Sequence, residues 1–71
     1  MKINTKQAAQ ALSGNHKFGQ ISFSMLMWRL KRMYDEKATP ETLQKCTDEI
    51  NGFLERYEKI MAADYAILSR L

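Results

Sequence analysis

Hydrophobic residues recur every three or four positions through most of the chain, which is the spacing of amphipathic helices. Thr39-Pro40-Glu41 supplies a cap, a proline suited to the first turn and an acid near the helix start. A long helix is therefore predicted from about Pro40 to the C-terminus. Its apolar positions all fit one stripe: Leu43, Cys46, Ile50, Phe53, Leu54, Tyr57, Ile60, Met61, Tyr65, Leu68 and Leu71.

Two shorter helices are predicted before it. Asn4 and Gln7 have the spacing of a capping box, in which each side chain bonds the backbone amide of the other residue. This indicates a short first helix over about Thr5 to Ser13. A middle helix is favoured from near Ser22 or Ser24, and the residues on its core face have helical spacing. They are Phe23, Leu26, Met27, Leu30, Met33 and Tyr34.

The long helix has more apolar length than the middle helix can cover. At 1.5 Å per residue about 31 residues span roughly 46 Å, whereas about 14 residues span only about 21 Å. A long uncovered stripe is rare on a soluble monomer, so either the chain folds back at Asn51-Gly52 or a second copy covers it. The stripe stays in phase across Gly52, and glycine costs only about 1 kcal/mol inside a helix, which favours the second copy.

The sequence therefore predicts an all-α fold, with one small three-helix domain over residues 1–71. Its elements would be a short helix, a middle helix and a long C-terminal helix. The domain is expected to associate as a helical-bundle homodimer. The predicted dimer interface consists of Phe53, Tyr57, Ile60, Met61 and Leu68.

Composition argues against catalysis and metal binding. Cys46 is the only cysteine and His16 the only histidine, so one chain can form neither a disulfide nor a Cys/His zinc site. No phosphate loop, dinucleotide fingerprint or carboxylate cluster occurs. We expect no enzyme activity, no cofactor, no metal and no small-molecule substrate. No apolar run approaches the roughly 18 residues of a membrane span, and no secretory signal opens the chain, so a cytoplasmic protein without membrane contact is expected.

Charge divides the chain into two halves. Residues 1–34 carry a net charge of +6 with no acid, whereas residues 35–71 carry −3. The two halves either complement each other within the bundle, or the basic half attracts nucleic acid phosphates or an acidic protein surface. The candidate nucleic-acid-binding residues are Lys2, Lys6, Lys17, Arg29, Lys31 and Arg32.

The run Met25 to Met33 carries an anomaly. With Phe23 and Leu30 facing the core, the opposite side of the helix should be polar, yet it contains a methionine and a tryptophan. Arg32 follows the tryptophan by four positions and can stack on its ring. Either the first helix or the Lys17-Phe18 loop covers this side, or it is an interface, because Trp, Met and Arg are enriched there. The predicted partner-binding residues are Met25, Trp28, Arg29 and Arg32.

The segment Ile3 to Leu12 resembles the opening helix of helix-turn-helix and excisionase-type DNA-binding domains, which carry a threonine and an alanine pair before a leucine. The resemblance implies a recognition helix after a turn of about three or four residues. In this chain at least the residues Ser13 to Gln20 separate the two predicted helices.

Two functions are therefore considered. The first is a non-catalytic, self-associating protein-binding module, an adaptor or inhibitor whose basic N-terminal half faces an acidic partner. The alternative is a small nucleic-acid-binding regulator with a helix-turn-helix-like N-terminal half.

Overall fold

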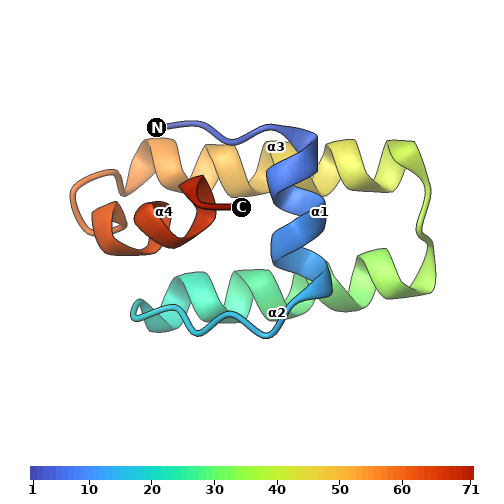
Figure 1. Cartoon of the computed structure of the whole chain (residues 1–71), viewed down its shortest axis with the longest axis horizontal. Helices are drawn as coiled ribbons and strands as arrows, with labels where there is room; N and C mark the ends of the chain where they lie inside the picture. Colours follow the sequence, from blue (N-terminus) through green and yellow to red (C-terminus); the bar gives the residue numbers. More distant parts are fainter.

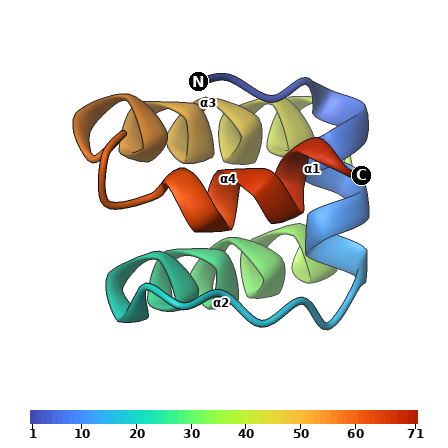
Figure 2. The same ribbon diagram turned by 60° about the vertical axis from the view of Figure 1, so that its left-hand side comes forward.

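The computed structural model describes residues 1–71 and contains four helices: α1 (Thr5–Ser13), α2 (Ile21–Glu36), α3 (Pro40–Arg56) and α4 (Ala62–Ser69). Helices α2 and α3 run antiparallel, joined by a short connection (Figure 1). Helix α1 crosses one face of this pair about midway along its length, between α4 and the connection (Figure 1). Helix α4 lies on the same face, between α2 and α3 at the other end (Figure 2). The all-α prediction is confirmed, but the chain has four helices instead of three.

Helices α1 and α3 begin with the predicted capping, whereas α2 begins at Ile21, ahead of the predicted Ser22 or Ser24, and has no side-chain cap. Asn4 Oδ1 accepts a hydrogen bond from the Gln7 amide at 2.9 Å, and Gln7 Oε1 accepts one from the Asn4 amide at 3.0 Å. Thr39 Oγ1 accepts a hydrogen bond from the Thr42 amide at 3.2 Å, with Pro40 in the first turn of α3. These side chains satisfy amides that have no partner within their own helix.

The prediction of one long C-terminal helix is wrong. Helix α3 ends at Arg56, and the chain turns back through 57–61, where the Ile60 and Met61 amides both donate to the Tyr57 carbonyl. The alternative break at Asn51-Gly52 is also wrong, because both residues lie inside α3. Asn51 binds the N-terminal segment instead: its side chain accepts from the Ile3 amide at 2.8 Å and donates to the Ile3 carbonyl at 2.9 Å.

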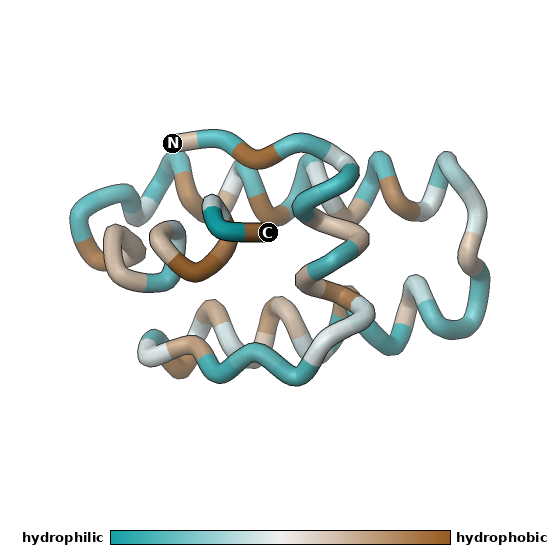
Figure 3. Tube along the Cα trace, viewed as in Figure 1, coloured by the Kyte–Doolittle hydropathy of each residue, from teal (hydrophilic) through white to brown (hydrophobic).

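The turn allows the chain to cover its own core. Met61 and Leu68, two of the five residues predicted for a dimer interface, are fully buried within the same chain. The long uncovered stripe that motivated the dimer is therefore absent. Hydrophobic positions alternate with polar ones along the helices, as Figure 3 shows. The buried hydrophobic residues are Ile3, Ala8, Ala11, Leu12, Phe23, Met27, Leu30, Cys46, Ile50, Leu54, Met61 and Leu68.

The predicted inner face of α2 is confirmed. Phe23, Met27 and Leu30 are buried, and the other three predicted positions are partly buried against the same core. Phe23 of α2 also contacts aromatic rings from other segments. Its ring meets that of Phe18 edge-on, with 4.8 Å between centroids, and its centroid lies 5.6 Å from that of Phe53. Helix α2 is thereby fixed by one face, and its other face is left toward solvent.

Candidate protein-interaction surface

Three large apolar side chains lie exposed along α2. Ile21 is 77% exposed, Met25 67% and Trp28 62%. Because they are spaced by four and three residues, they form one strip on the helix surface, here called the α2 strip. Neither α1 nor the Lys17-Phe18 loop buries Trp28. The alternative in which one of these segments covers this side of the helix is therefore wrong.

Two arginines lie beside the α2 strip. The Arg32 guanidinium lies over the Trp28 ring, 5.0 Å from its centroid, as the four-residue spacing predicted. Arg29 Nη2 lies 3.4 Å from a Glu49 carboxylate oxygen of α3. Both side chains of this ion pair are exposed, so it contributes at most about 1 kcal/mol and opens readily. The α2 strip is therefore accompanied by positive charge that can meet a partner's carboxylates.

Shallow hollows adjoin the α2 strip on both sides. The first is lined by the strip itself with Ser22, Ser24, Leu26 and Arg29. A second shares Leu26 and Arg29 with the first and extends onto α3 at Gly52 and Phe53. A third lies between Trp28 and the linker that precedes α2, and Lys17 is among its lining residues. The exposed side of α2 is thus continuous with the linker on one side and with α3 on the other.

The six predicted nucleic-acid-binding residues come from several segments. Lys2 lies in the N-terminal segment, which runs beside α3 across the molecule from α2 (Figure 1). Lys6 is exposed on α1, and Lys17 is exposed in the linker. Lys31 Nζ donates to the Gly14 carbonyl at 3.2 Å. Only Arg29, Lys31 and Arg32 share a helix.

The linker differs from the turn of a helix-turn-helix unit. It runs from residue 14 to residue 20 alongside α2, as Figure 1 shows. Since a turn of three or four residues fixes the angle of a recognition helix, α1 and α2 are not joined in the way that the resemblance implies. The short connection of this fold lies instead between α2 and α3, at residues 37–39.

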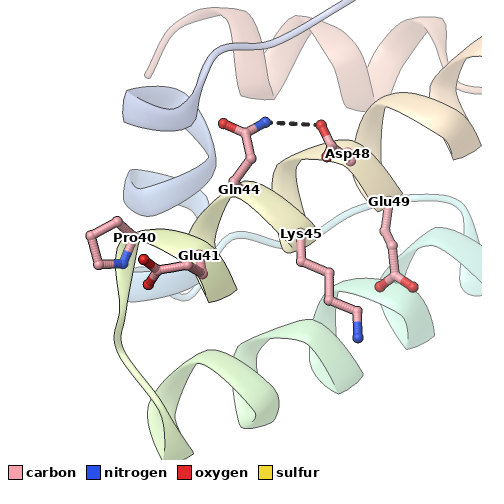
Figure 4. Close-up of a pocket in the computed structure, with 6 residues that line it drawn as sticks. All are labelled: Pro40, Glu41, Gln44, Lys45, Asp48 and Glu49. Carbon is pink, nitrogen blue, oxygen red and sulfur yellow. Dashed lines mark hydrogen bonds between the residues drawn. The ribbon is translucent and has the colours of Figure 1, made fainter.

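A separate hollow lies on the first half of α3. Six residues of one helix line it, and none is hydrophobic: Pro40, Glu41, Gln44, Lys45, Asp48 and Glu49 (Figure 4). Gln44 Nε2 donates to Asp48 Oδ1 at 2.9 Å, so part of the polar surface is satisfied along the helix itself. This is a hydrated helix face with mixed charges, and we assign it no chemistry. No group of three or more His, Cys, Asp or Glu residues is placed to hold a metal ion.

Asp64 is a buried acid that positions α2. The residue is 3% exposed on α4, and its carboxylate accepts the Gly19 amide at 2.8 Å and the Gln20 amide at 3.1 Å. It therefore ties α4 to the start of α2 and places negative charge at the positive end of that helix. Asp64 was not among the residues predicted from the sequence. Its position between Met61 and Leu68, on the buried stripe, was the signal that could have found it.

Cys46 is buried in the core, as expected from its place in the apolar stripe. Burial raises the pKa of its thiol above 9.0, and the nearby Glu49 carboxylate raises it further. The thiol also lies 3.8 Å from the Leu30 carbonyl, to which it can donate a hydrogen bond. Since the thiolate is the reactive form, this residue is poorly suited to nucleophilic chemistry.

None of the four helices combines the length and the apolar character needed to cross a membrane. Comparisons with protein-family models, with curated proteins and with solved structures found no match for this chain. The function proposed below therefore rests on the geometry and chemistry of the α2 strip and its surroundings.

Proposed function

We propose that this protein is a non-catalytic protein-binding module, an adaptor or inhibitor, that binds an acidic partner through the α2 strip with Arg29 and Arg32. One observation carries the proposal. Ile21, Met25 and Trp28 are exposed together on one helix, while the core of the chain is filled without them.

A partner that covers the α2 strip would bury a large apolar area. Fully burying a large aliphatic side chain contributes about 1.5 to 3 kcal/mol, so covering the three residues of the α2 strip would offset a substantial part of the cost of association. Their spacing of i, i+4 and i+7 is that of the anchors by which helices bind protein grooves. Trp and Arg are also the residue types most enriched among binding hot spots.

Charge supports an acidic partner. Arg29 and Arg32 accompany the α2 strip, Lys17 lies in the adjoining linker, and residues 1–34 contain no acid. Opposite charges on two surfaces accelerate association and disfavour wrong partners. Catalysis is not needed for this role. The cytoplasmic location expected from the sequence is also part of the proposal, and a single unpaired thiol is compatible with a reducing compartment.

Self-association through the C-terminal segment is not part of the proposal. Met61 and Leu68 are already buried, and of the remaining predicted interface residues only Tyr57 and Ile60 are exposed. These two side chains offer less apolar surface than the α2 strip does.

Nucleic acid is the alternative target. Arg29, Lys31 and Arg32 on α2 are the residues that favour it, but Arg29 pairs with Glu49 and Lys31 binds the Gly14 carbonyl. A phosphate backbone would also leave the apolar side chains of the α2 strip uncovered. We therefore favour a protein partner.

The test starts from a display library of helix-forming peptides selected against the wild-type chain. Affinities of the selected peptides are then measured by fluorescence anisotropy for wild type, Trp28→Ala and Ile60→Ala. Ile60 is the matched control, because it is 59% exposed but lies outside the α2 strip. Truncating a binding hot spot typically costs at least about 2 kcal/mol, so Trp28→Ala should weaken binding by more than about tenfold.

Circular dichroism should show the same helicity for all three proteins, and the selected peptides should be rich in Asp and Glu. Peptides that bind Trp28→Ala as tightly as wild type would contradict the proposal. A parallel titration with labelled duplex DNA tests the alternative. DNA binding that weakens steeply with added salt and is lost on replacing Arg29, Lys31 and Arg32 would assign the basic residues to phosphates instead.

A further inference from the structure

We infer that the binding surface continues from the α2 strip onto α3 at Gly52, and that its occupant is an acidic amphipathic helix of another protein. This inference rests on the proposed function and adds the partner's shape and orientation. It follows from three features of the molecule: the adjoining hollows between the α2 strip and α3, the surroundings of Gly52, and the distribution of charge along the exposed side of α2.

Two of the hollows next to α2 adjoin each other. Leu26 and Arg29 line both the hollow beside Met25 and Trp28 and the one that reaches Gly52 on α3. A partner that covers the α2 strip and contacts Leu26 and Arg29 therefore lies next to the groove between α2 and α3.

Gly52 has no evident role within its own chain. It lies inside α3, and no glycine of the protein has a positive φ, so the backbone there does not require glycine. A Cβ placed on Gly52 would meet no atom within 4 Å, whereas one placed on Gly14 would come within 2.7 Å of the His16 ring. Glycine weakens a helix interior, and close approach of a second backbone or ligand is a common reason for its presence. The space beyond Gly52 is open, so a second molecule can approach the backbone there.

The chemistry of the surface favours a helix as the occupant. All regular secondary structure in this chain is helical, so the surface offers no strand edge to which an extended peptide could pair. The anchors of the α2 strip are spaced along a helix, and a facing helix presents side chains with matching spacing.

Charge then orients that helix. On the Trp28 side the surface carries Lys17 and Arg32, with no acid among the residues that line the hollow next to the linker. On the Gly52 side Glu49 and Glu55 accompany Arg29 and Arg56. The acidic flank of the partner helix therefore faces Trp28 and Arg32, and small side chains face Gly52.

The test uses the tightest-binding peptide from the library selection and adds side chains at position 52. Gly52→Ala and Gly52→Gln are compared with Ala63→Gln, which lengthens an exposed residue on α4 outside the groove. Because overpacking an interface typically costs about 1 to 3 kcal/mol, Gly52→Ala should weaken peptide binding at least about fivefold and Gly52→Gln more. The thermal midpoint of Gly52→Ala should equal or exceed that of wild type. Ala63→Gln should bind as wild type does.

The outcomes separate this inference from the proposed function. If Trp28→Ala loses binding while both Gly52 variants bind as wild type does, the α2 strip is the binding surface and its extension to α3 is wrong. If Trp28→Ala binds normally, both fall together. Amide shifts in an NMR titration of the wild-type chain with the same peptide supply a readout without substitution. A shift of the Gly52 amide supports contact there, and an unchanged Gly52 amide overturns it.

Discussion

At the scale of single residues, Trp28 and Asp64 invert the usual placement of their types. The tryptophan lies on the surface under an arginine, and the acid lies in the interior. An exposed tryptophan is commonly kept for binding, whereas a buried carboxylate needs hydrogen-bond donors around it. In this protein the two are linked, because Asp64 holds the start of the helix that carries Trp28.

Asp64→Ala should lower the free energy of unfolding by about 1 to 3 kcal/mol, because it removes the hydrogen-bond acceptor of the Gly19 and Gln20 amides. Asp64→Asn keeps one acceptor oxygen and should lose less. Asp48→Ala, at an exposed position of α3, is the control and should change stability by less than about 0.5 kcal/mol. Urea unfolding followed by circular dichroism measures all three. Equal stability of Asp64→Ala and wild type would show that α4 is held by apolar packing alone.

Cys46 should make stability depend on pH in the alkaline range. Its pKa is raised above the ordinary 9.0 by burial, so the folded chain keeps the proton that the unfolded chain releases. This thiol therefore leaves stability unchanged below about pH 9, and stability falls as the pH rises from there through the folded pKa. Between pH 9 and higher values wild type should therefore lose more stability than Cys46→Ala does. If the free energies of unfolding of the two proteins fell by the same amount with rising pH, the raised pKa of Cys46 would be contradicted.

At the scale of elements, the starts of α1 and α3 were predictable, whereas the start of α4 and the end of α3 were not. The capping box at Asn4 and the Thr39-Pro40 start involve neighbouring residues, so their chemistry is visible in the sequence. The end of α3 has no comparable signal in the sequence. The turn at 57–61 contains no proline or glycine, and the apolar stripe stays in phase across it, so local patterns gave no sign of a break.

Asn51-Gly52 shows the opposite case. The pair has the composition of a turn, yet it lies within α3, because Asn51 uses its amide to bind Ile3 at the N-terminus. Contacts across forty-eight positions of sequence cannot be read from local propensity.

Gly52→Ala should raise the free energy of unfolding by about 0.5 to 1 kcal/mol, since alanine is the better helix former and the added methyl group meets no atom of the chain. Chemical denaturation of wild type and Gly52→Ala measures the difference. The same change at Gly14 should destabilise, because there the methyl group would collide with His16. A loss of stability in Gly52→Ala would mean that the region around Gly52 is filled in the free protein.

At the scale of the whole molecule, the predicted dimer and the observed fold are two ways to bury the apolar residues of the C-terminal segment. A C-terminal stripe longer than its neighbour needs cover, and the chain supplies that cover itself by turning α4 back between α2 and α3 (Figure 2). Helical spacing indicates which residues form the apolar face of a helix, but it does not indicate whether the same chain or a second one buries that face. The apolar side chains on the outer face of α2 were predictable as an anomaly of that spacing, whereas their exposure and the neighbouring hollow at Gly52 required the fold.

The fluorescence of Trp28, the only tryptophan, tests the central claim most directly. Emission and acrylamide quenching are recorded over a range of protein concentrations, first alone and then with the tightest-binding acidic peptide. We expect solvent-exposed emission and strong quenching at every concentration of the free chain, with a blue shift and protection from quenching when the peptide is added. Blue-shifted, protected emission from the free chain would contradict the central claim, because the α2 strip would then already be covered by the chain itself or by a second copy.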